Sequence, residues 1–221
     1  MSEEMQLKGN ARMVKGTKEL NQEGCRFFLD SGPEQVTLIT SASLRWLTHK
    51  NNDGTPCSEE QEEANKKIME ASEHPDVTKM KLKVLLYENP VGKKTGVEHI
   101  KTLLKCDGVD IRYGKVKKDH RWRLAMNDNR IFLSKSASET SKVSLGWVCE
   151  TQEKNDMLVE YFKYEFDEDF EAAKHKRLKL KGDKIVYYDN WLRRFLKWIV
   201  SDRGIAIMGI IIGAVIAFIL R

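Results

Sequence analysis

The chain has 221 residues, of which 32% are charged and 41% hydrophobic, and its formal net charge is +5 at pH 7. This balance is typical of a cytoplasmic globular domain and leaves room for one well-cored domain. The cysteines, Cys25, Cys57, Cys106 and Cys149, form no Cys-x-x-Cys pair, and no histidine stands at metal-ligand spacing. We therefore expect reduced, structural cysteines, no metal site and no cofactor.

The first half of the chain predicts helices that alternate with strands. A helical pattern covers residues 4–32 and ends at a Gly-Pro pair. Its expected buried positions are Met13, Leu20, Phe28 and Leu29. The β-branched run 35–41 predicts a short buried strand. A capping box, Ser58 with Gln61, opens a helix that reaches about residue 74.

The second half continues this alternation and ends in a helix. The expected strands cover residues 81–87, 109–113, 120–126, 130–133 and 144–149. The expected helices cover residues 96–106 and 155–174. A turn at residues 127–129 joins two of the strands into a hairpin. This order of helices and strands implies an α/β sandwich.

The C-terminal segment 204–220 contains no charged or polar side chain. At a rise of about 1.5 Å per residue it spans roughly 25 Å, near the thickness of a bilayer's hydrocarbon core. It predicts a single transmembrane helix, with a helix buried in the protein core as the alternative. Residues 1–20 are charged and contain no apolar signal-peptide segment, so insertion is expected to follow translation, as in tail-anchored proteins.

The residues before this segment predict an amphipathic helix at the membrane interface. Aromatic residues and basic residues recur there at helical spacing on opposite sides. The expected membrane-interface residues are Trp191, Arg193, Arg194, Lys197 and Trp198. Beyond the apolar segment Arg221 is the sole basic residue, so the positive-inside rule places the large domain in the cytoplasm.

A basic stretch, residues 174–184, lies directly before the amphipathic helix. We expect residues 175–203 to form a basic linker followed by that helix, and residues 1–14 to form an N-terminal tail. Lysines next to a membrane anchor are expected to meet anionic lipid headgroups of the bilayer. Binding to nucleic acid is the alternative for this stretch.

Five short segments in succession carry a resemblance to a known family. They are residues 80–86 (MKLKVLL), 108–112 (GVDIR), 120–128 (HRWRLAMND), 130–134 (RIFLS) and 145–148 (LGWV). Followed by an aromatic-rich helix, they resemble one repeat of the phospholipase D superfamily over residues 15–174. This resemblance implies a single phospholipase D-like α/β sandwich domain. It also implies chemistry in which two facing repeats each supply a histidine, one attacking phosphorus and one protonating the leaving group, while lysines hold the phosphate oxygens.

The family signature is only partly present. In the family it is His-x-Lys, four residues, Asp, six residues and Gly-Ser. His120 matches the histidine. The other positions hold Trp122 for the lysine, Asn127 for the aspartate, and Ser134 and Lys135 for Gly-Ser. Arg121 and Arg123 are expected to point away from His120, because neighbouring residues of a strand face opposite sides. Loss of the phosphate-holding lysine predicts little or no phosphodiesterase activity.

The candidate site residues lie around this signature. His120 is the candidate catalytic residue, with Asp128 as the acid after a one-residue shift; a surface histidine is the alternative for His120. Lys115, Lys117 and Lys118 form a basic loop just before it. The loop predicts binding of a phosphate or a lipid headgroup, with a solvated loop as the alternative.

The apolar C-terminal segment also carries a pattern of small residues. Gly209, Gly213 and Ala217 recur every four residues, a spacing that lets two helix backbones approach closely. The alternative is that small residues are simply common in such helices. The family's need for a second repeat gives the same expectation of a homodimer.

We therefore expect a membrane-anchored, catalytically inactive, phospholipase D-like binding, sensor or scaffold module that faces the cytoplasm. A membrane-bound homodimeric phosphodiesterase using His120 is the first alternative. A nucleic-acid-binding module is the second. The family resemblance alone does not decide among them, because one fold supports many functions.

Overall fold

The structure is a computed structural model. It describes residues 9–30, 35–41, 44–48, 58–75, 79–93, 97–114, 123–135, 145–151 and 157–188. The chain divides into two compact units, residues 1–187 and 188–221. The helices and strands below belong to the first unit.

A seven-stranded mixed sheet forms the centre of this unit, in the order β1-β7-β6-β5-β2-β3-β4. Strands β2, β3 and β4 run parallel, and the other neighbours pair antiparallel. The strands are β1 Gly9–Lys15, β2 Thr37–Ser41, β3 Leu82–Leu86, β4 Val109–Tyr113, β5 Arg123–Met126, β6 Arg130–Lys135 and β7 Leu145–Thr151. All but β1 match strands expected from the sequence.

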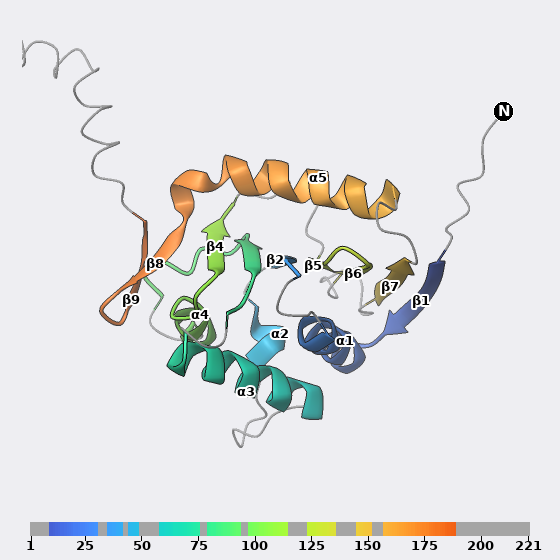
Figure 1. The fold of residues 1–221 in the computed structure, drawn as a ribbon, viewed down its shortest axis with the longest axis horizontal. Coiled ribbons are helices and arrows are strands. Elements are labelled where there is room, and N and C mark those ends of the chain that lie inside the picture. The colour runs from blue at the N-terminus through green and yellow to red at the C-terminus, as the bar shows by residue number, and fades with distance from the viewer. Residues whose placement is uncertain are drawn as a thin grey trace, which may run out of the picture. The chain divides into compact units, whose positions relative to one another are not determined.

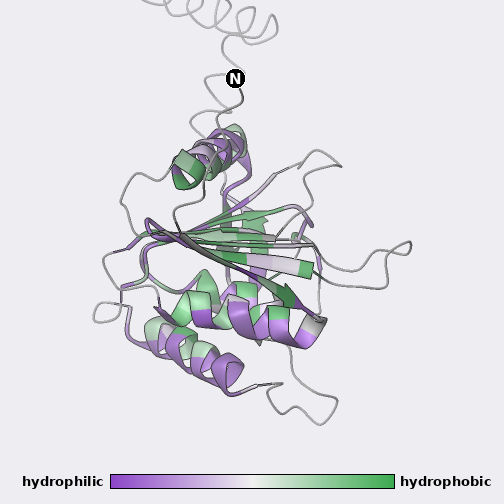
Figure 2. Ribbon diagram, turned by 90° about the vertical axis from the view of Figure 1, so that its right-hand side faces the viewer, coloured by the Kyte–Doolittle hydropathy of each residue, from purple (hydrophilic) through white to green (hydrophobic). Residues whose placement is uncertain are grey.

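Helices cover both faces of the sheet (Figure 1): α1 to α4 lie on one face and α5 lies along the other. They are α1 Thr17–Asp30, α2 Arg45–Thr48, α3 Glu59–Glu73, α4 Glu98–Leu103 and α5 Met157–Ala172. Figure 2 shows the sheet edge-on between helices, with hydrophobic residues concentrated in the strands. The expected α/β class is therefore confirmed.

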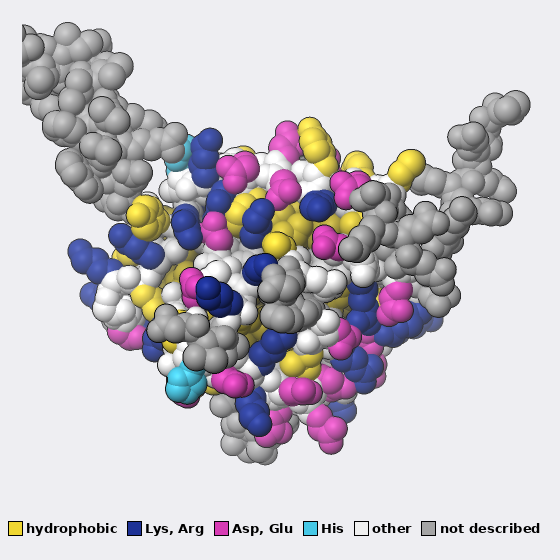
Figure 3. Space-filling view, viewed as in Figure 1, with side chains coloured by type: hydrophobic (Ala, Val, Ile, Leu, Met, Phe, Trp, Pro, Cys, Tyr) yellow, Lys and Arg dark blue, Asp and Glu magenta, His cyan; other side chains and the backbone are white. Residues whose placement is uncertain are grey.

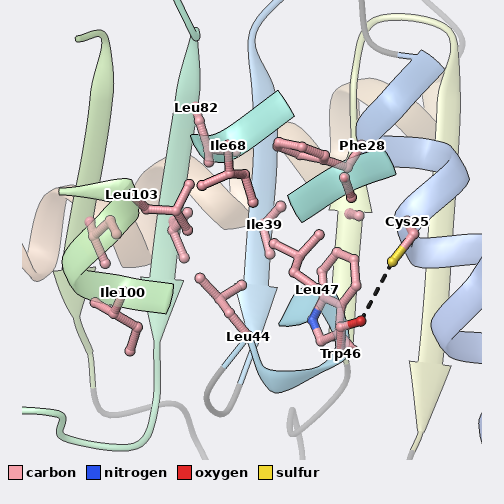
Figure 4. Close-up of a cluster of buried hydrophobic side chains, with 14 of the residues drawn as sticks. Cys25, Phe28, Ile39, Leu44, Trp46, Leu47, Ile68, Leu82, Ile100 and Leu103 are labelled. Carbon is pink, nitrogen blue, oxygen red and sulfur yellow. Dashed lines mark hydrogen bonds between the residues drawn. The ribbon is translucent and has the colours of Figure 1, made fainter. Parts of the chain in front are cut away.

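The larger core lies between the sheet and helices α1 to α4 (Figure 4). Ile39 of β2 and Leu82 of β3 project from the sheet, and Leu47 of α2, Ile68 of α3 and Leu103 of α4 pack against them. Each of these five side chains is at most 2% exposed. Burial of apolar surface contributes about 25 cal/mol per Å², so this cluster is the main source of stability on that face.

The smaller core, under α5, combines apolar packing with charged contacts. The rings of Phe166 and Phe170 stack with centroids 5.3 Å apart. The Arg112 guanidinium lies 3.8 Å from the Phe170 ring centroid, and its Nη1 donates to the Phe170 carbonyl at 2.9 Å. These contacts join α5 to β4.

Local sequence signals set several element ends as expected. Ser58 is the N-cap of α3, and its side chain accepts a hydrogen bond from the Gln61 N–H at 3.2 Å. Gly108 has a φ of +76°, and a Cβ there would lie 2.2 Å from the Met80 carbonyl oxygen. The turn from α4 into β4 therefore requires glycine.

The prediction for the N-terminus is wrong over residues 9–15. These residues form β1, which pairs antiparallel with β7, and not a helix or a tail. Met13, expected to be buried, is 55% exposed, whereas Leu20 and Phe28 of α1 are buried as predicted. The strand depends on a partner far later in the chain, so the local pattern did not show it.

The expected basic linker is also wrong over residues 175–187. The structure forms a short 3₁₀ helix at Lys174–Lys176, strand β8 at Leu178–Lys181 and strand β9 at Lys184–Tyr187. The two strands pair antiparallel as a separate hairpin. Leu178 and Ile185 are 3% and 5% exposed and belong to the larger core. The folded unit therefore continues to Tyr187.

Candidate functional site

Several strand ends lie at one edge of the sheet. Ligands commonly bind next to such strand ends. The parallel strands end in register there, with Ser41 opposite Leu86 and Leu86 opposite Tyr113. Strand β5 starts at the same edge, because it runs antiparallel to β2. Strand β6 ends there, since Arg123 pairs with Ser134. We call this the carboxyl edge of the sheet; in open α/β sheets ligands bind outside such strand ends.

The segment predicted to hold the site lies between two strands of this edge. Lys115, Lys117, Lys118 and His120 all lie outside the described residues. The buried Gly114 follows β4, and Arg123 opens β5. The segment that carries the four predicted side chains therefore starts and ends at the carboxyl edge.

Asp128, the candidate acid, is among the described residues, whereas His120 is not. It lies in the turn after β5, whereas His120 precedes β5 in the chain. A strand rises about 3.3 Å per residue, so roughly 13 Å of backbone separates the start of β5 from this turn. The Asp128 carboxylate is 3.9 Å from the Lys163 Nζ, on the α5 side. The role of Asp128 as the acid stays a prediction.

Asn127, at the aspartate position of the signature, serves the same turn. Its Oδ1 accepts a hydrogen bond from the Asn129 N–H at 3.1 Å. Its Nδ2 donates to the Gln35 Oε1 at 3.5 Å, which joins the turn to the residues before β2. The side chain is buried and holds the hairpin.

Ser134, at the glycine position of the signature, is closed to a ligand. Its side chain is 1% exposed, and no group in the part of the chain that the structure describes bonds its Oγ. It pairs with Gly146, and a Cβ on that glycine would lie 2.4 Å from the Leu20 Cδ2 and 3.2 Å from the Ser134 Cβ. Helix α1 thus packs over this position.

Ser41, at the end of β2, is likewise occupied by the protein. Its Oγ accepts hydrogen bonds from the Leu44 N–H at 3.4 Å and from the Trp46 Nε1–H at 3.3 Å. These bonds hold the turn from β2 into α2, where Leu44 has a φ of 56°. Trp46 is a core residue.

An aromatic and basic cluster flanks the end of β4. The rings of Tyr113 and Tyr187 have centroids 6.4 Å apart, and the Lys176 Nζ lies 4.9 Å from the Tyr113 centroid. The Tyr187 hydroxyl donates to the Asn89 Oδ1 at 2.9 Å. Burial raises the pKa of Tyr187 above its usual value, the neighbouring Tyr113 adds to the rise, and the bond to Asn89 opposes it. The phenol is therefore a neutral hydrogen-bond donor at physiological pH.

No local sequence pattern marks this cluster. Tyr113 stands directly before the predicted basic loop, and that position was the available signal. Lys176 and Tyr187 come from a stretch expected to be a linker, and only the β8–β9 hairpin brings them to Tyr113. Two tyrosines thus flank the carboxyl edge at the end of β4, and local sequence patterns do not predict this pair.

Three of the four cysteines are among the described residues. Cys25, Cys106 and Cys149 are in no disulfide, and Cys57 is outside the described residues. Burial, helped by the charge of Glu60, raises the pKa of Cys25 to about 12, and burial raises that of Cys106 to about 11. Both are inert thiols at neutral pH. No group of three His, Cys, Asp or Glu side chains suited to a metal ion occurs among the residues described above.

The residues predicted to act at the membrane lie beyond Tyr188, the last described residue. They are the interface residues Trp191, Arg193, Arg194, Lys197 and Trp198, and the helix-pairing residues Gly209, Gly213 and Ala217. Within the described part of the chain, the helices are all too short or too polar to cross a bilayer.

No family model and no curated protein sequence matches the chain. Three solved structures are similar at low identity. TrmBL2, an archaeal chromatin protein with a novel mode of DNA binding, is 13% identical, with a TM-score of 0.46 over 74% of this chain and 52% of that one. Polyphosphate kinase from Porphyromonas gingivalis is 12% identical, with a TM-score of 0.42 over 72% and 26%. Phosphatidylserine synthase from Haemophilus influenzae Rd KW20 is 10% identical, with a TM-score of 0.41 over 88% and 46%. The chain spans about half of TrmBL2 and less of the other two.

Proposed function

We propose that the chain is a membrane-anchored, catalytically inactive relative of the phospholipase D superfamily whose domain binds a phosphate-bearing ligand. The observation that carries the proposal is the position of Gly114 and Arg123, which both lie at the carboxyl edge of the sheet. The segment between them contains Lys115, Lys117, Lys118 and His120. Several cations in one loop at such an edge suit a phosphate group.

The absence of catalysis is proposed from the residues that replace the family's polar groups. Trp122 stands where the family's lysine would hold phosphate oxygens, and an indole offers no positive charge. Asn127 holds the β5–β6 turn, and Ser134 is buried beneath α1. A retained histidine with a weakened phosphate clamp supports binding without hydrolysis.

Hydrolysis of bis(p-nitrophenyl) phosphate by the detergent-solubilised full chain tests this part. We expect rates at the level of buffer for both the wild-type chain and His120→Ala. Robust turnover that is lost in His120→Ala would replace the proposal with the phosphodiesterase alternative. Equal turnover in both proteins would point to a contaminating enzyme. The proposal is therefore supported only if the hydrolysis rate of each protein equals that of buffer.

Binding is tested by isothermal titration with inorganic phosphate and with glycerophosphoserine. The triple variant Lys115→Gln, Lys117→Gln, Lys118→Gln should bind at least tenfold more weakly, because it loses three charges. Lys66→Gln, on the exposed side of α3, is the matched control and should bind as the wild type does. Equal binding by the triple variant and the control would contradict a phosphate site in this loop.

The anchor and its orientation belong to the same proposal. The apolar segment 204–220 would span the bilayer, with Trp191, Trp198 and nearby basic residues at the interface and the folded unit in the cytoplasm. In cells, the chain should resist alkaline extraction from membranes. A protease added to the outside of intact cells should leave residues 1–187 uncleaved. Extraction by alkali would contradict the anchor, and cleavage in sealed cells would contradict the orientation.

A homodimer completes the proposal, since a single repeat of this family needs a second copy to complete its site. Gly209→Ile with Gly213→Ile should reduce cross-linked dimer in membranes, because bulky side chains would separate the two helices. Ile211→Leu, on the other side of the same helix, is the control. Unchanged cross-linking in the double variant would show that this pairing face is idle.

A further inference from the structure

The β8–β9 hairpin has one apolar face and one basic face. Leu178 pairs with Tyr187 and Leu180 with Ile185, and these side chains pack against the larger core. On the other face Lys179 pairs with Val186, and Lys181 pairs with Lys184 at the turn. Lys181 and Lys184 are exposed. Strand alternation therefore places the three lysines of the hairpin on its outer face.

Helix α4 extends this basic surface at the hairpin turn. The Lys101 Nζ lies 2.9 Å from the Asp183 Oδ2. This hydrogen bond, with the charges of Lys101 and Lys105, lowers the pKa of Asp183. Lys101, Lys105, Lys181 and Lys184 together carry four positive charges around the carboxylate of Asp183; Glu98, three residues before Lys101, and Asp107, two residues after Lys105, are also exposed carboxylates. We call these four lysines, with Lys179, the hairpin patch; Figure 3 shows basic side chains gathered over the hairpin and acidic ones over α5.

The chain continues from the hairpin towards the predicted anchor. Tyr188 follows β9 directly, and residues 188–203 lead to the apolar segment that begins at Gly204. These residues reach at most roughly 55 Å when fully extended and carry Arg193, Arg194 and Lys197. A surface tethered at this distance from a bilayer meets headgroups at high effective concentration.

The outer face of the hairpin suits a lipid surface better than a nucleic acid. Its described side chains are Lys179, Lys181, Lys184 and Val186, none of which has an aromatic ring for stacking on bases. An anionic leaflet attracts lysine ammonium groups without requiring a specific geometry. Each lysine near the surface raises the membrane-binding constant about fivefold. We propose that the hairpin patch binds the anionic phospholipid headgroups of the membrane that carries the anchor. This inference rests on the proposed anchor.

The test uses the full chain reconstituted into vesicles of phosphatidylcholine, with or without phosphatidylserine. A water-soluble acylating reagent labels exposed lysines, and mass spectrometry measures the labelling rate at each. Lys105, Lys181 and Lys184 should react several-fold more slowly when phosphatidylserine is present, and high salt should abolish the difference. Lys66 of α3 should react equally in both vesicles. Equal rates at Lys184 in both vesicles would overturn the inference.

A variant with reversed charge separates the patch from the fold. Lys181→Glu with Lys184→Glu changes two exposed turn residues and should leave thermal unfolding unchanged. It should remove the protection of Lys105 by phosphatidylserine, whereas the matched control Lys66→Glu should retain it. Single-stranded DNA binding that this variant loses, with no phosphatidylserine effect in the wild-type chain, would assign the patch to nucleic acid and overturn the inference.

Flotation of the vesicles distinguishes the anchor from the patch. A chain that floats with both vesicles supports the anchor, and the labelling rates then decide the inference. A chain that floats only with phosphatidylserine-containing vesicles contradicts the anchor but supports the patch. A chain that floats with neither overturns both.

Discussion

The two faces of the central sheet are closed by different physical means. On the face covered by α1 to α4, four helices enclose a large apolar cluster in which Ile39, Leu47 and Leu86 are completely buried. On the other face α5 is the one helix among the described residues, and its Tyr161 and Tyr164 are more than half exposed. The difference indicates that the first face determines the stability of the fold, whereas the second tolerates change.

Charged groups follow the same division. Under α1 the carboxylate of Glu23 is 5% exposed and contacts three arginines, Arg12, Arg26 at 3.0 Å and Arg130 at 3.9 Å. On the α5 face the Lys83 Nζ lies 3.4 Å from the Asp167 Oδ1, and both side chains are nearly half exposed. Removing a buried carboxylate that several cations share costs far more stability than removing one partner of an exposed ion pair, because the remaining charges lose their partner in a poorly solvated place.

The largest expected effect comes from neighbouring leucines of β3 that face opposite sides. Leu86 belongs to the larger core and Leu85 to the smaller, and both are at most 1% exposed. We expect Leu86→Ala to lower the free energy of unfolding by about 3 to 5 kcal/mol and Leu85→Ala by about 2 to 3 kcal/mol, because α5 can shift into the space left behind. Urea unfolding measures both, and equal or reversed losses would contradict the difference between the faces.

A smaller effect is expected from the carboxylates. Glu23→Gln should lower the free energy of unfolding by about 2 to 3 kcal/mol, because three arginines lose a shared buried partner. Asp167→Asn is the matched change on the other face and should cost less than about 0.5 kcal/mol. The same urea titration compares them, and a loss at Asp167 as large as that at Glu23 would remove the distinction.

The smallest expected effect concerns cysteine reactivity. Cys25 and Cys106 belong to the larger core, and their pKa values are raised from 9.0 to about 12 and about 11. Cys149 packs at the margin of the smaller core and is half-buried. Alkylation by iodoacetamide at pH 8, followed by mass spectrometry, should therefore modify Cys149 before Cys25 and Cys106. Faster modification of Cys25 would show that the larger core opens more readily than its packing implies.

The same thiols make stability depend on pH in the alkaline range. Their pKa values are higher in the folded chain than the ordinary 9.0, so the folded chain holds these protons more tightly. Stability should accordingly fall as pH rises above about 9, where the thiols of the unfolded chain ionise first. Cys25→Ser with Cys106→Ser should weaken that dependence in thermal unfolding scans between pH 8 and 10.

Elements with strong local signals were predictable from the sequence. The apolar runs of β2, β3 and β4 identify buried strands, Ser58 caps α3, and an Asn-rich turn joins β5 to β6. The strand β1 was missed because its residues lack a strand pattern and are held by pairing with β7. The β8–β9 hairpin was not predicted, because its many lysines are typical of a solvated linker. Apolar residues nevertheless alternate with these lysines, as in a strand.

The candidate site was predictable only in part, for the same reason. The basic loop before His120 is visible in the sequence, since four cationic or titratable residues fall within a few positions. The pairing of Tyr113 with Tyr187 and Lys176 depends on the hairpin returning to the end of β4. Strand direction places Asp128 at the end of β5 opposite Arg123, which the signature alone does not show.

By itself, the sequence determined the α/β class, the lysines before His120 and the apolar C-terminal segment. These are properties of short stretches, where propensity and hydrophobic period act on neighbouring residues. The tertiary structure alone decided that β1 completes the sheet, that Ser134 is buried under α1, and that the lysines of residues 179–184 form one face. Such features arise from contacts between distant segments, whose energy no local pattern contains.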